Sequence, residues 1–208
     1  MEDVLSVYCR PYDPKRPMIC MDERSYALRS EVRAPRRMKP GRAARYDHHY
    51  RRRGVMNVFM FFEPLAGRRE VMLRAQRTKA DWAYAMRALL TEQYPEAETV
   101  VVVMDNLNTH TPASFYEVFP PEEARRLVER LEIHYTPEHG SWLNMAEIEL
   151  SVLTRQCLSR RIGEERMLVD EVMAWKEERN QQSATARWQF RNEEARMKLK
   201  HLYPKNEP

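Results

Sequence analysis

Residues 99–104 read TVVVVM and are followed directly by Asp105-Asn106. An uninterrupted run of β-branched side chains is typical of a strand that is buried on both faces. Such strands occur in α/β proteins, where helices pack on both sides of the sheet. The sequence therefore predicts an α/β fold built around this strand, with Asp105 at its carboxyl end.

Shorter patterns on either side predict the remaining elements. We expect strands at residues 16–22, 57–63, 70–75 and 132–135, and helices at 79–93, 142–160, 164–179 and 192–202, with one more helix opening at 120–123. Ser141 is expected to cap the helix at 142–160. The order of three strands, helix, strand, helix, strand and further helices predicts a mixed sheet flanked by helices.

Length and composition exclude several classes of protein. A chain of 208 residues with 43% hydrophobic and 32% charged residues suits one or two folded domains and not a disordered polymer. No run approaches 18 apolar residues, and the N-terminus lacks the pattern of a secretion signal, so we expect no membrane segment. The cysteines Cys9, Cys20 and Cys157 form no zinc-binding pattern. Their sparse use predicts reduced thiols and a cytoplasmic location.

Positive charge is concentrated in one segment. The whole chain carries a formal charge of +4, but residues 29–53 hold ten basic side chains against only Glu31 and Asp47. The basic side chains are Arg29, Arg33, Arg36, Arg37, Lys39, Arg42, Arg45, Arg51, Arg52 and Arg53. Arginine binds phosphate oxygens through two parallel N–H groups, so this segment suits a polyanion. A solvated basic loop without a ligand remains the alternative.

Four carboxylates occupy places that suit metal chemistry. Asp22 is expected at the end of the first strand, Asp105 ends the central strand, and Glu147 and Glu149 lie early in the long helix. Sites in α/β sheets form beyond the carboxyl ends of the strands. Carboxylate oxygens there can hold Mg²⁺ or Mn²⁺, and two such ions support phosphodiester chemistry. A single acid after a strand is also a common turn or helix cap.

Three segments carry a resemblance to a known family. DNLNTH at residues 105–110 resembles the second-aspartate motif of mariner-type DDE transposases. YTPEHGSWLNMAE at 135–147 resembles their third-carboxylate motif, in the bacterial insertion-sequence-630 branch, and CMDE at 20–23 resembles the first-aspartate strand. The resemblance covers essentially the whole chain, and the two long motifs are specific.

The resemblance implies an RNase H-like fold in which Asp22, Asp105 and Glu147 are catalytic and bind two ions of Mg²⁺ or Mn²⁺. It further implies strand cleavage at transposon ends, strand transfer into target DNA, and a homodimer. From charge alone we assign DNA binding to nine side chains. These are Arg33, Arg36, Arg37, Lys39, Arg42, Arg45, Arg51, Arg52 and Arg53.

The third carboxylate requires a choice between two residues. On a helical wheel the long helix has an apolar face that consists of Met145, Ile148, Val152 and Leu153. Glu149 lies within this face and Glu147 at its edge, so the wheel does not select Glu147. A buried Glu149 must be paired, protonated or directed at a metal. The family pattern places its acid three residues after Asn144, which selects Glu147. Accessory candidates are Asn106, His110, Asn144 and Glu149, and Trp142 is expected in the core.

We expect residues 1–180 to form the catalytic domain, with the basic segment inserted at about 29–53, and 181–208 to form a C-terminal helical tail. Full-length relatives carry an N-terminal helix-turn-helix region, which this sequence lacks ahead of its first strand. The chain would therefore be the catalytic half of a split transposase, served by a separate helix-turn-helix chain, or a truncated remnant. Rival interpretations are a catalytically inactive DNA-binding remnant and an RNase H-like nuclease of recombination or repair.

Overall fold

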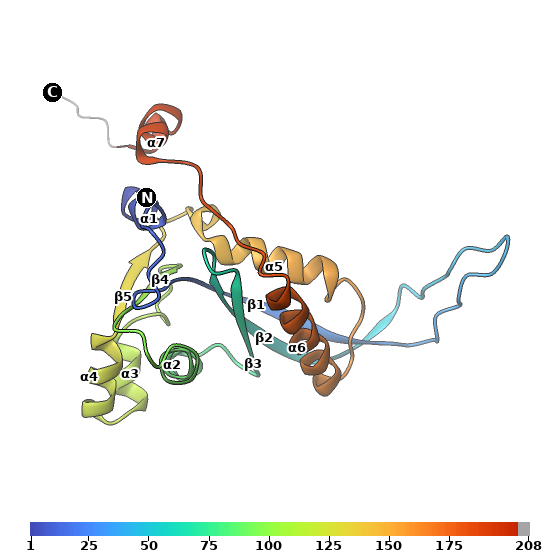
Figure 1. Cartoon of the computed structure of the whole chain (residues 1–208). Helices are drawn as coiled ribbons and strands as arrows, with labels where there is room; N and C mark the ends of the chain where they lie inside the picture. The colour runs from blue at the N-terminus through green and yellow to red at the C-terminus, as the bar shows by residue number, and fades with distance from the viewer. Residues whose placement is uncertain (204–208) are drawn as a thin grey trace.

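The computed structural model describes residues 1–203 and contains one five-stranded sheet (Figure 1). Its strands are β1 (Met18–Glu31), β2 (Tyr50–Glu63), β3 (Arg68–Arg74), β4 (Val100–Met104) and β5 (Leu131–Tyr135), in the order β3-β2-β1-β4-β5. β1 pairs antiparallel with β2, and β2 with β3, whereas β4 runs parallel to both β1 and β5. The predicted mixed sheet is confirmed.

Helices cover both faces of this sheet. One face packs against α1 (Glu2–Tyr8), α5 (Met145–Gln156), α6 (Glu165–Gln181) and α7 (Asn192–Lys198). The other packs against α2 (Lys79–Ala88), which continues as a π-helical turn at Leu89–Gln93, and against α3 (Ala113–Val118) and α4 (Pro121–Glu129). The result is a three-layer α/β/α arrangement with two separate apolar cores.

The central strand explains why there are two cores. All five residues of β4 are buried. Val101 and Val103 belong to the core under α5, and Val100, Val102 and Met104 belong to the core under α2. Because neighbouring side chains of a strand point to opposite faces, a continuous valine run supplies both cores at once.

The first two strands are longer than the sequence predicts. β1 continues past Asp22 to Glu31 and β2 already begins at Tyr50, so the expected strand end at Asp22 is wrong. The added part of β2 is exposed up to Val55, whereas the added part of β1 mixes exposed, half-buried and buried positions. Backbone pairing between the two strands, and not an apolar pattern, keeps them extended. A bulge shifts the register between Leu28 and Arg29.

The predicted basic insertion is the outer part of this hairpin. Beyond the strands the chain continues as a narrow arm that extends away from the body (Figure 1). Backbone bridges pair Arg36 with Arg45 and Lys39 with Arg42. Gly41 closes the tip with φ +72°, a conformation that glycine adopts without strain.

Three further differences concern helices. The long helix begins at Met145 with Asn144 as its N-cap, so the expected cap at Ser141 is wrong, because Ser141–Leu143 forms a separate 3₁₀ turn. The sequence predicts neither α1 nor α3.

No helix in residues 1–203 is long and apolar enough to cross a membrane. The division at residues 180 and 181 stays a prediction, and 204–208 of the expected tail lie outside the described residues.

Candidate active site

Asp22 and Asp105 lie side by side on neighbouring strands. Met21 pairs with Met104 in the parallel ladder, and each aspartate is the next residue of its chain. Two residues earlier, Cys20 and Val103 both contribute to the core under α5. Since strand side chains alternate, both carboxylates are directed to the face that α5 covers, on strands about 4.8 Å apart.

The environment of Asp22 shows that a third acid is near. Burial raises the pKa of the Asp22 carboxyl to about 7, while a 2.7 Å hydrogen bond from the backbone N–H of Glu23 opposes the rise. The negative charges of Asp105 and Glu147 raise this pKa further. The charges of Asp105 and Glu147 thus reach Asp22, so the three predicted carboxylates lie in the same region of the molecule.

Thr136, which the sequence did not single out, holds Asp105 in place. The hydroxyl of Thr136 donates a 2.8 Å hydrogen bond to Oδ1 of Asp105. Thr136 is buried and follows β5, whose last residue, Tyr135, pairs with Met104. The strand register thus places the hydroxyl of Thr136 beside the Asp105 carboxylate. In the sequence, this contact could have been suspected from the polar residue directly after β5.

Asn144 fixes the helix that carries Glu147. Its side-chain oxygen accepts from the backbone N–H of Ala146, which caps α5, and its amide donates to the carbonyl oxygen of Met21 at 2.8 Å. The buried Asn144 side chain therefore joins the start of α5 to β1 one residue before Asp22. Glu147, three residues later, is half-buried in the first turn.

Glu149 belongs to a different cluster. Its carboxylate forms two 2.9 Å hydrogen bonds with Arg69 and accepts weaker ones from Arg179. Burial raises the pKa of Glu149, but the hydrogen bonds and charges of Arg69 and Arg179 outweigh this and lower it overall. Glu149 is thus a core residue in an ion pair, one of the alternatives that the sequence leaves open.

The helical wheel was wrong in one respect. Ile148 was expected on the apolar face of the long helix, yet its side chain is 49% exposed. The buried positions of α5 are Met145, Ala146, Glu149, Leu150 and Leu153. Glu149 lies among them because Arg69 comes from β3 to meet it inside the core.

The remaining candidates do not join the carboxylates. Asn106 is exposed in the loop after β4. His110 is buried against Trp82, with Nδ1 at 3.3 Å from the backbone oxygen of Asp105 and Nε2 at 3.5 Å from Glu23. His110 therefore supports the loop that follows β4. Trp142 is 45% exposed, so the expectation that it lies in the core is wrong.

The donor chemistry of the site fits a hard divalent cation. Carboxylate oxygens are the ligands that Mg²⁺ and Mn²⁺ prefer. The pKa of Asp22 is raised first by burial and then by the charges of Asp105 and Glu147, which a cation would offset. Within residues 1–203, no three His, Cys, Asp or Glu side chains are gathered closely enough to hold a metal as they stand. Asp22, Asp105 and Glu147 are the residues that would bind the ion.

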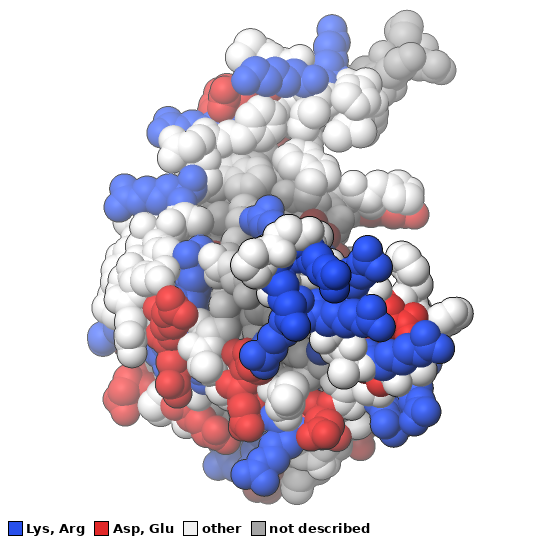
Figure 2. Space-filling model, turned by 90° about the vertical axis from the view of Figure 1, so that its right-hand side faces the viewer, with Lys and Arg blue, Asp and Glu red and all other residues white. Residues whose placement is uncertain are grey.

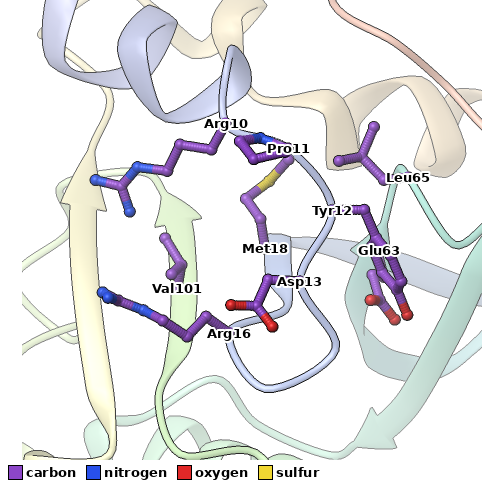
Figure 3. Close-up of a pocket in the computed structure, with 9 residues that line it drawn as sticks. All are labelled: Arg10, Pro11, Tyr12, Asp13, Arg16, Met18, Glu63, Leu65 and Val101. Carbon is purple, nitrogen blue, oxygen red and sulfur yellow. The ribbon is translucent and has the colours of Figure 1, made fainter.

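A cavity of about 330 Å³ lies away from these carboxylates (Figure 3). It sits beside Met18 and Val101, at the opposite end of β1 and β4. Two arginines on its wall, Arg10 and Arg16, are both paired with Glu132, at 2.6 and 2.5 Å. These groups tie the N-terminal segment to β5, and the carboxylate site remains the better candidate for chemistry.

The predicted DNA-binding side chains lie on the arm and its base. Arg33, Arg36, Arg37, Lys39, Arg42 and Arg45 belong to the arm, and Arg51, Arg52 and Arg53 to the exposed start of β2. All nine are exposed. Figure 2 shows Lys and Arg side chains gathered on the side of the molecule from which the arm projects. The nearest acid is Asp47, 3.9 Å from Arg33.

Known proteins share this fold. Three solved structures are similar over 88% of the chain: the Mos1 mariner paired end complex with Mn (TM-score 0.57, 16% identity), the Mos1 transposase paired-end complex with left transposon end (0.56, 16%) and a pre-cleavage Mos1 transpososome (0.53, 15%). The matched region spans 55% of the first two of those chains and 59% of the third. No curated protein sequence gives a significant match.

The sequence itself matches a family over most of its length. Residues 17–169 match the DDE superfamily endonuclease family, a region that runs from the start of β1 into α6. Asp22, Asp105 and Glu147 all lie inside it. The chain belongs to the DDE superfamily endonucleases.

Proposed function

We propose that this chain is the catalytic part of a transposase of the insertion-sequence-630 branch, which cuts DNA strands at transposon ends and joins them to target DNA. The observation that carries the proposal is the placement of Asp22 and Asp105 at one level of adjacent parallel strands, with Glu147 on the helix above them. Family membership supports strand cleavage as the reaction class.

In this proposal Asp22, Asp105 and Glu147 bind two ions of Mg²⁺ or Mn²⁺. DDE-type endonucleases use divalent metals, and such ions supply an activated attacking oxygen and stabilise the leaving oxygen in phosphodiester chemistry. Thr136 orients Asp105 through its 2.8 Å hydrogen bond, and Asn144 keeps α5 against β1.

DNA is the proposed partner. The Mos1 structures of this fold are described as complexes with a transposon end or as a transpososome. In this chain the exposed basic arm supplies the positive charge that duplex DNA attracts. We further propose a homodimer that joins two ends and a separate helix-turn-helix chain that recognises the end sequence.

Cleavage of DNA that contains a transposon end tests the proposal, with Mg²⁺ or Mn²⁺ present and a candidate helix-turn-helix chain supplied. The wild type should nick the DNA, and Asp105→Ala should not. Glu122 is exposed in the first turn of α4, on the opposite face of the sheet, so Glu122→Gln is a suitable control and should keep activity. DNA binding without any cutting would favour a catalytically inactive remnant and would overturn the enzyme assignment.

A further inference from the structure

A groove of about 450 Å³ lies between β1 and α5. Four arginines line it, namely Arg24, Arg29, Arg160 and Arg161, and its lining in the described part of the chain includes no acidic residue. Ser25, Thr154 and Ser159 add hydroxyl groups. A concave surface with several guanidinium groups and hydroxyl donors is suited to an anionic ligand that carries oxygen acceptors.

The groove begins next to the carboxylates. Arg24 follows Asp22 by two residues on β1, so both side chains are on the α5 face. Arg24 donates to the hydroxyl of Thr154 at 3.2 Å, and Thr154 follows Glu147 by two turns of α5. The first arginine of the groove thus neighbours the proposed catalytic site.

The other end of the groove leads to the basic arm. A second cavity, of about 410 Å³, shares Arg29 and Arg161 with the first and adds Arg53. Arg53 lies at the base of the arm, where its Nε donates to the hydroxyl of Ser30 at 2.9 Å. Glu31 and Glu164 also line this second cavity. Arginines therefore extend from beside Asp22 along β1 to the base of the arm, with two acids among them at the outer end.

Two of the four groove arginines are paired with acids, and the other two are not paired within residues 1–203. Arg161 pairs with Glu31 at 2.6 Å, and Arg160 contacts Glu171. By contrast, Arg24 and Arg29 form no ion pair with an acid within residues 1–203, and Arg29 instead lies 4.7 Å above the ring of Tyr50. The internal pairs hold the wall in place, and Arg24 and Arg29 remain available to bind phosphate.

We propose that this groove binds the phosphodiester backbone of the DNA strand beside the phosphate that reacts. The proposal rests on the proposed function, because it takes DNA as the ligand and Asp22 as part of the site. Three neighbouring carboxylates repel DNA, and guanidinium groups that grip the adjacent phosphates offset this repulsion. The path also gives a single bound strand contact with both the carboxylates and the arm.

The salt dependence of DNA binding tests the groove directly. Binding of a fluorescein-labelled duplex is measured by anisotropy in EDTA, from low to high salt, for wild type and the double variant Arg24→Gln/Arg29→Gln. Each lost phosphate contact reduces the slope of log affinity against log salt by roughly 0.9, so the double variant should lose about 1.8. Between 50 and 200 mM salt its affinity should fall roughly tenfold less than that of wild type.

Two controls separate charge from folding. Arg126→Gln/Arg125→Gln removes the same charge from exposed positions of α4, on the opposite face of the sheet, and should leave the slope unchanged. Arg24→Lys/Arg29→Lys keeps both charges and should restore most of the slope. Thermal melting followed by circular dichroism establishes that each variant is folded.

An unchanged slope in a folded Arg24→Gln/Arg29→Gln variant would overturn the groove. An equal loss in the α4 variant would also overturn it, since binding would then follow net charge alone. Because no cutting occurs in EDTA, the outcome is independent of the reaction. If the double variant has a reduced slope but the wild type never nicks DNA, the groove is supported and the nuclease is rejected. If the wild type nicks DNA but the double variant has an unchanged slope, the nuclease is supported and the groove is rejected.

Discussion

The side-chain amide of Asn144 donates a hydrogen bond of 2.8 Å to the carbonyl oxygen of Met21, the residue before Asp22. The same side chain caps α5 through the backbone N–H of Ala146. One buried residue therefore holds the helix of Glu147 against the strand of Asp22. The geometry of the carboxylates depends on this contact as much as on the acids themselves.

Replacing Asn144 should destabilise the protein. Asn144→Ala removes a helix cap and a buried hydrogen bond and should lower the free energy of unfolding by about 1–3 kcal/mol, as measured by urea denaturation. Ser141→Ala is the matched control, since Ser141 is the cap that the sequence suggests, and it should change stability by less than about 0.5 kcal/mol. The reverse order of the two effects would contradict the capping that we describe.

Replacing Glu147 should impair activity, whereas replacing Glu149 should lower stability. Glu149→Gln leaves Arg69 buried without its charged partner and should cost about 3–5 kcal/mol in the free energy of unfolding. Glu147→Gln removes a half-buried acid whose charge reaches Asp22, so it should abolish nicking without loss of stability. Nicking assays and urea denaturation of both variants provide the comparison. Full nicking by Glu147→Gln would show that the third ligand is another residue.

The Glu149 ion pair should also make stability depend on pH. Its folded-state pKa is lowered below the ordinary value of 4.5, so the pair contributes fully above that value and loses its contribution as pH falls through the folded-state pKa. The stability difference between wild type and Glu149→Gln should be constant from neutral pH to about pH 5 and shrink below about pH 4.5. Chemical denaturation across this range measures it, and a difference that grows on acidification would be inconsistent with the ion pair.

Removing a carboxylate from the cluster should have opposite effects with and without metal. In EDTA, Asp22→Asn relieves repulsion from Asp105 and Glu147 and should raise the melting temperature. Mn²⁺ should stabilise the wild type, by about 2.7 kcal/mol at a hundredfold excess over its dissociation constant, and should not stabilise the variant. Differential scanning fluorimetry measures both, with Glu122→Gln as the control that keeps the Mn²⁺ response. An undiminished Mn²⁺ shift in Asp22→Asn would exclude Asp22 as a ligand.

Elements with a strong local pattern could be predicted from the sequence. β4 was expected at 99–104 and spans Val100–Met104, because burial on both faces leaves no polar position to blur the pattern. The outer half of β1 could not be predicted, because it is mostly polar, shows no apolar alternation and is kept extended by its pairing with β2. Short α1 and α3 also lack a pattern long enough to identify them.

The candidate site also has a part that the sequence predicts and a part that it does not. The strand-end position of Asp105 followed from the sequence, and the family pattern selected Glu147. The partner of Glu149 did not follow, because Arg69 is 80 residues away along the chain and only the fold brings the two together. The groove beside Arg24 was hidden for a similar reason, since half of its wall comes from residues 150–161.

The proposed function requires that Asp105 binds a divalent ion on which DNA cutting depends. Its most direct test is nicking by Asp105→Cys, because a thiolate is a softer ligand that binds Mn²⁺ better than Mg²⁺. The wild type should nick end-containing DNA with either ion. Asp105→Cys should lose nicking in Mg²⁺ and regain part of it in Mn²⁺. Full activity of this variant in Mg²⁺, or wild-type nicking that persists in EDTA, would contradict the account.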